Sequence, residues 1–206
     1  MTRVRVCILG LGLFLGTAAI AEETTNQERA EQEVSPEELQ QGIGAFQDVY
    51  EVLQHPRCLN CHPSGDAPLQ TDASTPHAMN ITRASTDAGL QCAACHQVQN
   101  SEAYGVDAGP PGAPNWHLPE KEMPLIFEGR TVSELCMQLK EPSQNGHKTL
   151  DQLYLHVAHD PLVLWGWEPG GDRTKPQLSH EKFARQFKTW VDAGAPCPTV
   201  SDSIEK

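Results

Sequence analysis

Two stretches of the chain place a pair of cysteines directly before a histidine. The stretch CLNCH contains Cys58, Cys61 and His62, and the stretch CAACH contains Cys92, Cys95 and His96. Two thiols separated by two residues can bind zinc, form a redox-active dithiol, or add to the two vinyl groups of a haem. Two copies of the same pattern exceed what chance gives in a chain with this many cysteines and histidines.

The histidine after each pair distinguishes the three alternatives. A four-cysteine zinc site gives no reason for a histidine after both pairs, and a thioredoxin-like dithiol needs a βαβ context that the sequence lacks. In a c-type haem the two-residue spacer matches the separation of the vinyl groups, and the adjacent histidine reaches the iron. We therefore expect two covalently bound haem c groups, attached through the four cysteines, with His62 and His96 as proximal iron ligands.

Each iron also needs a ligand on its other side. His77 follows the first motif and His117 follows the second, each in a turn-rich loop with a proline close by, which lowers the entropy lost when the loop presents a ligand. We expect these two histidines to be the distal ligands, each for the motif that it follows. Met123 and His156 are the alternatives; a Met-Pro pair ahead of a helix is how small cytochromes c supply a methionine, which raises the reduction potential.

Cys136 and Cys197 are the cysteines left over once both motifs and the N-terminal Cys7 are set aside. In an oxidising compartment such an even remainder predicts a disulfide. It would stabilise the fold by about 4 kcal/mol in the chain-entropy model. Ligation of a haem iron by Cys136 is the alternative.

Helical signals dominate the sequence. Ser35-Pro36-Glu37-Glu38 combines an N-cap, a proline at the first helical position and acids in the first turn, and apolar residues then recur at helical spacing as far as Leu53. Shorter helices are expected at 132–140, 150–158 and 179–192. Residues 63–86 are turn-rich and 105–125 form a proline-rich loop, and strand signals are few. The expected fold class is mostly α with long Pro/Gly-rich loops.

Such a chain needs more than side chains to fill its core. Glycine and proline number 16 each and aromatic residues make up only 6%. Two haems are large apolar bodies around which loops and short helices can pack. We therefore expect a small dihaem cytochrome c-like domain over residues 36–198, packed around two covalent haems.

The N-terminus has the pattern of an export signal. Residues 1–21 contain two early arginines, a short apolar run and a final Ala-Ile-Ala, which predict a cleaved Sec-type signal peptide. A flexible leader at 22–35 and a C-terminal tail at 199–206 complete the expected organisation. The mature protein is expected to be periplasmic and to have no membrane span.

The charge of the chain limits its partners. The formal net charge is −12, and without the signal peptide 13 basic side chains face 27 acidic ones, a charge of −14. A surface of this kind argues against binding to nucleic acid or to an anionic membrane, and favours basic or charge-patched protein partners.

Longer runs of the sequence resemble a known family. They are HPRCLNCHPSGDAPLQ, PHAMN, PPGAPNWHLPEKEMP, ELCMQLK, DPLVLWGW and WVDAGAPCP, within residues 45–198. With these runs the chain resembles exported dihaem c-type cytochromes that are often labelled isoquinoline 1-oxidoreductase subunit. The resemblance implies a small dihaem cytochrome that accepts electrons from a molybdenum hydroxylase. Only the haem-attachment residues are carried over from it.

The expected function is therefore electron transfer in the periplasm. The donor would be a dehydrogenase or hydroxylase and the acceptor a further cytochrome or an oxidase, with this chain as the electron-carrier subunit rather than the enzyme. The chain has no dinucleotide-binding fingerprint and no iron–sulfur cysteine set. The alternative is a small dihaem enzyme of the peroxidase or thiosulfate-oxidising type, which needs one haem with an open position.

Overall fold

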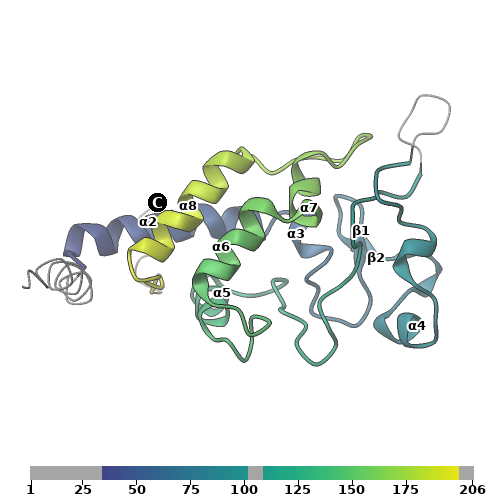
Figure 1. Cartoon of the computed structure of the whole chain (residues 1–206), viewed down its shortest axis with the longest axis horizontal. Coiled ribbons are helices and arrows are strands. Elements are labelled where there is room, and N and C mark those ends of the chain that lie inside the picture. Colours follow the sequence, from purple (N-terminus) through teal and green to yellow (C-terminus); the bar gives the residue numbers. More distant parts are fainter. Residues whose placement is uncertain (1–33, 102–108, 200–206) are drawn as a thin grey trace, which may run out of the picture. The chain divides into compact units, whose positions relative to one another are not determined.

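A computed structural model of the chain describes residues 34–101 and 109–199. The expected signal peptide, nearly all of the leader and nearly all of the C-terminal tail lie outside the described residues. From Ser35 onward the described residues belong to one compact unit. Helices make up most of its regular structure, so the fold is mostly α, as expected (Figure 1).

The four helices that the sequence predicts all form close to their expected bounds. Each begins after a serine or threonine whose side chain accepts a hydrogen bond from a backbone N–H of the first turn. Such an N-cap contributes about 1 kcal/mol, which explains why the starting points could be read from local sequence. The helices are α2 (Pro36–Leu53), α5 (Val132–Lys140), α6 (Leu150–His159) and α8 (His180–Asp192).

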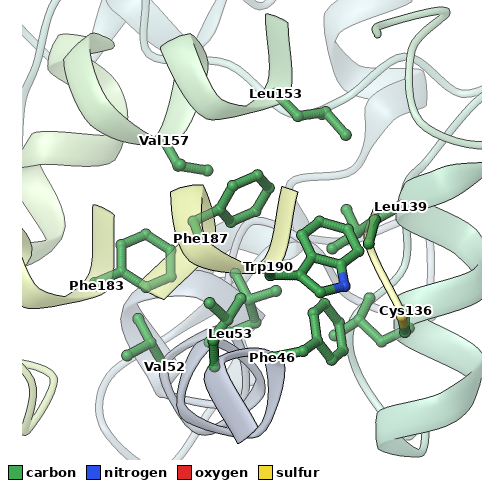
Figure 2. Packing of buried hydrophobic residues seen from close by; sticks show 14 of the residues in the cluster. Phe46, Val52, Leu53, Cys136, Leu139, Leu153, Val157, Phe183, Phe187 and Trp190 are labelled. Carbon is green, nitrogen blue, oxygen red and sulfur yellow. The ribbon is translucent and has the colours of Figure 1, made fainter. Parts of the chain in front are cut away.

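Helix α2 packs along α8, and this pair forms the centre of the hydrophobic core. The rings of Phe46 on α2 and Trp190 on α8 are fully buried, with centroids 4.8 Å apart. Figure 2 shows how Phe187 extends the core from α8 towards Leu153 and Val157 of α6. Burial of side chains of this size contributes about 1.5–3 kcal/mol each. The first and last helices therefore pack together, as expected.

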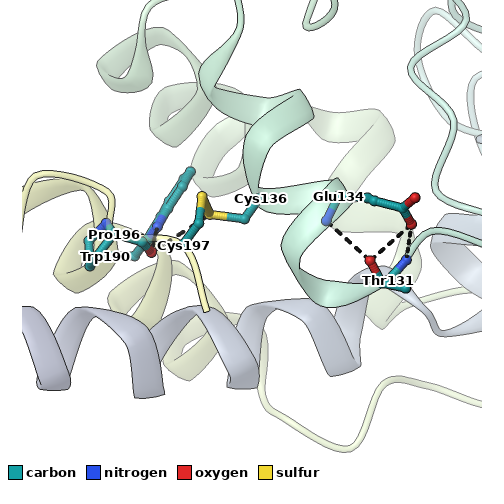
Figure 3. The surroundings of a disulfide bond; sticks show 6 residues. All are labelled: Thr131, Glu134, Cys136, Trp190, Pro196 and Cys197. Carbon is teal, nitrogen blue, oxygen red and sulfur yellow. Dashed lines mark hydrogen bonds between the residues drawn. A yellow bond between two sulfur atoms is a disulfide. The ribbon is translucent and has the colours of Figure 1, made fainter. Parts of the chain in front are cut away.

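The segment after α8 is fixed at two points. Cys136 on α5 and Cys197 form a disulfide with an S–S distance of 2.06 Å, and the indole N–H of Trp190 donates to the carbonyl oxygen of Pro196 at 3.0 Å (Figure 3). Gly42 allows α2 to approach this segment closely, because a Cβ at that position would lie only 2.6 Å from the Cβ of Ala193. The end of the described chain is thereby held against α2 and α5.

The turn-rich region and the corner after α6 contain short elements that local patterns did not predict. Between residues 63 and 87 the chain forms an antiparallel hairpin, a short 3-10 helix and a short α-helix, whereas the described part of the proline-rich loop has neither helix nor strand, as expected. No described helix is both long enough and apolar enough to cross a bilayer. The short elements are α3 (Pro56–Leu59), β1 (Leu69–Gln70), β2 (Thr75–Pro76), η1 (Ala78–Asn80), α4 (Arg83–Asp87), η2 (Cys92–Ala94), α7 (Pro161–Leu164) and η3 (Trp165–Trp167).

Candidate haem sites

The first CxxCH motif forms one turn of helical backbone at the end of α3. The amide of Cys61 donates to the carbonyl oxygen of Cys58 at 3.2 Å, and the amide of His62 donates to the same oxygen at 3.1 Å. These bonds join residues three and four apart, so the motif can adopt this turn without help from distant residues. Both thiols and the imidazole line a single cavity.

His62 is oriented by Leu125, the last residue of the proline-rich loop, and by Phe127 just after it. Its Nδ1 lies 2.7 Å from the carbonyl oxygen of Leu125, and its ring stacks on Phe127 with centroids 3.9 Å apart. Burial lowers the pKa of His62 to about 4, which keeps the imidazole neutral at neutral pH. With Nδ1–H donating to a carbonyl, Nε2 is the nitrogen left for a metal, as is usual for metal-ligating histidines.

His96 in the second motif is held in the same way. Its Nδ1 lies 2.7 Å from the carbonyl oxygen of Pro111, and its ring stacks on Trp116 with centroids 4.5 Å apart and planes at 1°. Burial lowers the pKa of His96 as well. Pro111 and Leu125 stand at the two ends of the described proline-rich loop, so this one loop orients the histidines of both motifs.

The first motif opens on a cavity with about 980 Å³ of empty space, part of it open to solvent. Burial raises the pKa of the Cys58 thiol to about 12 and that of Cys61 to about 11. A redox dithiol acts as a thiolate, which this environment disfavours. The apolar wall includes Leu139, Leu153, Val157, Trp165, Phe183 and Phe187.

Two buried arginines carry N–H groups without a hydrogen-bond partner. Arg57 lines the first cavity and forms an ion pair with Asp72, but its Nε is unpaired, and its side chain is only 2% exposed. Arg83 lines a second cavity and donates to two backbone carbonyl oxygens, each at 3.0 Å, while its Nη2 is unpaired. Haem carries two propionate carboxylates, and charge-assisted bonds to them would satisfy both arginines. These residues therefore fit a haem in each site.

The second cavity lies beside Cys92 and has about 880 Å³ of empty space. Its lining is more polar than that of the first cavity and includes Glu120, Lys121 and Glu122. Cys95 is exposed. Burial and then the nearby Cys92 raise the pKa of Cys61, so the two motifs are neighbours in the fold although residues 63–91 separate them along the chain.

The expected distal ligands do not all lie beside the motif that they follow. His77 was paired by sequence with the first motif, but its ring lies 5.9 Å from that of His96, centroid to centroid. His117 and His156 both line the first cavity with His62, and His117 also lines the second. The Met123 sulfur accepts a hydrogen bond from the amide of Gly146 at 2.7 Å, and Met123, like His77 and His96, lines neither of these cavities.

An aromatic connection between the two sites was missed by sequence reasoning. Trp116, which stacks on His96, meets Trp165 edge to face with centroids 4.8 Å apart, and Trp165 lines the first cavity. Asn100 fixes this contact, because its Oδ1 accepts from the indole N–H of Trp165 at 2.9 Å and from the amide of Gly112 at 3.0 Å. The residues come from three separate segments, so no local pattern could have indicated the contact.

Within residues 34–101 and 109–199, no three histidine, cysteine or acidic side chains are grouped so that they could hold a metal ion. Comparison of the chain with protein-family models, with curated proteins and with solved structures finds no match. The chemistry of the two sites is accordingly argued from the residues of this chain.

Proposed function

We propose that the chain is a periplasmic dihaem c-type cytochrome that transfers electrons between redox proteins. One observation carries the proposal: the same arrangement occurs at both motifs. Each motif histidine has its Nδ1 at 2.7 Å from a backbone carbonyl oxygen and its ring stacked on an aromatic side chain. The arrangement leaves Nε2 of His62 and of His96 for an iron, and places two thiols beside each.

The residues of the chain would bind and bury the two groups. The motif cysteines would attach them by thioether bonds, and Arg57 and Arg83 would donate to the propionates. A bound haem supplies an iron that takes up and releases one electron. Leu139 and Phe183 would exclude water from the first site, and this burial would raise its reduction potential relative to the more polar second site.

A path for electrons between the sites is supported by the aromatic rings. Trp116 contacts both His96 and Trp165, and Trp165 lines the cavity of the first motif. The second site is the one nearer to solvent, because Cys95 is exposed and the side chain of Val98 is 72% exposed. We therefore assign the contact with partner proteins to the second site. Small, transient interfaces are typical of such electron-transfer encounters.

The proposed donor is a periplasmic oxidoreductase of the molybdenum hydroxylase type, and the proposed acceptor is another cytochrome or an oxidase. The support for this donor is the resemblance of residues 45–198 to cytochromes of that kind. The chain has a formal net charge of −12. A partner with a basic docking patch would therefore associate with it faster than a neutral partner, and the difference would be largest at low ionic strength.

Expression in a host that attaches haem c tests the proposal. We expect two haems that remain bound after denaturation, and one in the variant Cys92→Ala/Cys95→Ala. The reduced protein is then exposed to carbon monoxide, and an unchanged absorption spectrum is expected because both irons have two protein ligands. Binding of carbon monoxide to one haem would instead favour the dihaem enzyme, with peroxide and sulfur compounds as substrates to assay. A protein without covalent haem would refute both functions.

A further inference from the structure

We propose that His77 is the second axial ligand of the iron held by His96, so that the second site takes a ligand from the loop that follows the first motif. This inference deepens the proposed function and rests on it. Its basis is a juxtaposition of side chains from separate loops: the ring centroids of His77 and His96 lie 5.9 Å apart, with the ring planes at 62°.

The separation is the one that a shared iron requires. A metal–nitrogen bond of about 2 Å, with a ring centroid about 1.2 Å beyond the nitrogen, puts two imidazoles on opposite sides of one metal about 6 Å apart. Rotation about the metal–nitrogen bonds permits any angle between the two ring planes, including 62°.

The hydrogen bonds leave the appropriate nitrogen of each ring. Nδ1 of His77 lies 2.7 Å from the carbonyl oxygen of Ala78, and Nδ1 of His96 lies 2.7 Å from that of Pro111. A backbone carbonyl can only accept, so each Nδ1 carries the proton and each Nε2 keeps a free lone pair. This tautomer is the one that metal-ligating histidines adopt.

A hairpin tied to the first motif explains how His77 reaches the second. The amide of Leu69 at the start of the hairpin donates to the carbonyl oxygen of Asn60, between the two cysteines of the first motif, at 2.9 Å. At its end the amide of His77 donates to Pro68 at 3.0 Å, and the amide of Ala78 donates to the Gln70 side chain at 3.1 Å. The backbone before His77 is therefore fixed to one motif while its ring lies beside the histidine of the other.

The first site does not need His77. Two other histidines, His117 and His156, line the cavity that contains His62. Nδ1 of His156 lies 3.1 Å from a carboxylate oxygen of Asp160, which leaves its Nε2 for a metal in the manner of a carboxylate–histidine pair. Candidate ligands therefore remain for the first haem if His77 binds the iron of the second. This agrees with a crossed arrangement, in which the loop after the first motif provides a ligand to the second haem.

The variant His77→Ala tests the assignment in the dihaem protein. We expect one of the two haems to become high-spin in the electron paramagnetic resonance spectrum and to bind carbon monoxide when reduced, because its iron has lost a ligand. His77→Met should restore a low-spin spectrum with a higher reduction potential at that haem. His159→Ala is the matched control, since His159 is an exposed histidine at the end of α6, and it should leave both haems low-spin.

Single-haem variants identify which site is affected. His77→Ala should change the spectrum of the protein that lacks the first attachment, Cys58→Ala/Cys61→Ala, and should not change that of Cys92→Ala/Cys95→Ala. If either double variant does not fold, nuclear magnetic resonance of the dihaem protein gives the same answer. In that case the hyperfine shifts of Trp116 protons should respond to His77→Ala, while those of Phe127, which stacks on the other proximal histidine, should not.

Each other outcome overturns the inference. Two low-spin haems in His77→Ala would show that His77 binds neither iron, and a change confined to the first haem would show that His77 serves the motif it follows. Both results leave the dihaem function standing. A wild-type protein without covalent haem overturns the proposed function and this inference together.

Discussion

Replacement of Gly42 by alanine should destabilise the protein, although alanine is normally the better helix residue. A Cβ at this position would lie 2.6 Å from the Cβ of Ala193 and 2.8 Å from Cγ of Pro196, about 1 Å closer than carbon atoms pack. Overpacking of this kind costs about 1–3 kcal/mol. The higher helix propensity of alanine contributes about 1 kcal/mol in the opposite direction, so we expect the free energy of unfolding to fall by up to about 2 kcal/mol.

Gly44 is the matched control in the same helix. Nothing lies within 4 Å of a Cβ built there, so Gly44→Ala should gain the helix-propensity term alone. Urea denaturation followed by circular dichroism gives both free energies of unfolding, and their difference isolates the close contact at Gly42 from helix propensity. We expect Gly42→Ala to be less stable than Gly44→Ala by about 1–3 kcal/mol. Equal stabilisation in the two variants would refute the close approach of α2 to the segment after α8.

Three further changes probe the elements around the first site. Cys136→Ala/Cys197→Ala removes a disulfide between residues 61 apart and should lower the free energy of unfolding by about 4 kcal/mol. Urea denaturation, with the oxidised wild type as reference, measures this loss. A loss below about 1 kcal/mol would contradict the chain-entropy account. Gln138→Leu removes the side-chain amide that donates to the half-buried carbonyl oxygen of Ile126 at 2.9 Å, which should cost about 1 kcal/mol in the same assay; an unchanged stability would indicate that water replaces the amide. Glu128 accepts hydrogen bonds from the backbone and hydroxyl of Ser64, which lower its pKa; its contribution is therefore present above the ordinary pKa of a glutamate and is lost as the pH falls through the lowered value. Glu128→Gln should accordingly flatten the acid limb of a stability–pH curve, and an unaltered curve would speak against this role.

Features that depend on neighbouring residues could be predicted from sequence. The helix starts at Ser35, Thr131 and Ser179 are set by side chains that bond to amides three residues further on, so local spacing is sufficient to find them. The CxxCH turns are equally local, because their hydrogen bonds join residues three and four apart. The pairing of Cys136 with Cys197 was inferred by elimination rather than by geometry.

The two buried arginines are features that sequence reasoning did not identify. Arg57 and Arg83 stand in polar stretches, where a charged residue is expected to face solvent. Each is nevertheless nearly buried. Arg57 pairs with the carboxylate of Asp72, and Arg83 donates to two backbone carbonyl oxygens of other segments. Burial of a charge is determined by such partners, which composition and periodicity do not identify.

The two CxxCH motifs, the proposal of covalent haem and the prediction of the main helices therefore come from the sequence alone. Only the tertiary structure decided that the carbonyls of Pro111 and Leu125 orient the motif histidines, and that the ring of His77 lies 5.9 Å from that of His96. The physical reason is that the loops carrying these groups have no hydrophobic period and few local hydrogen bonds. Their paths are selected by contacts with distant segments, and order along the chain gives no measure of which motif a loop will reach.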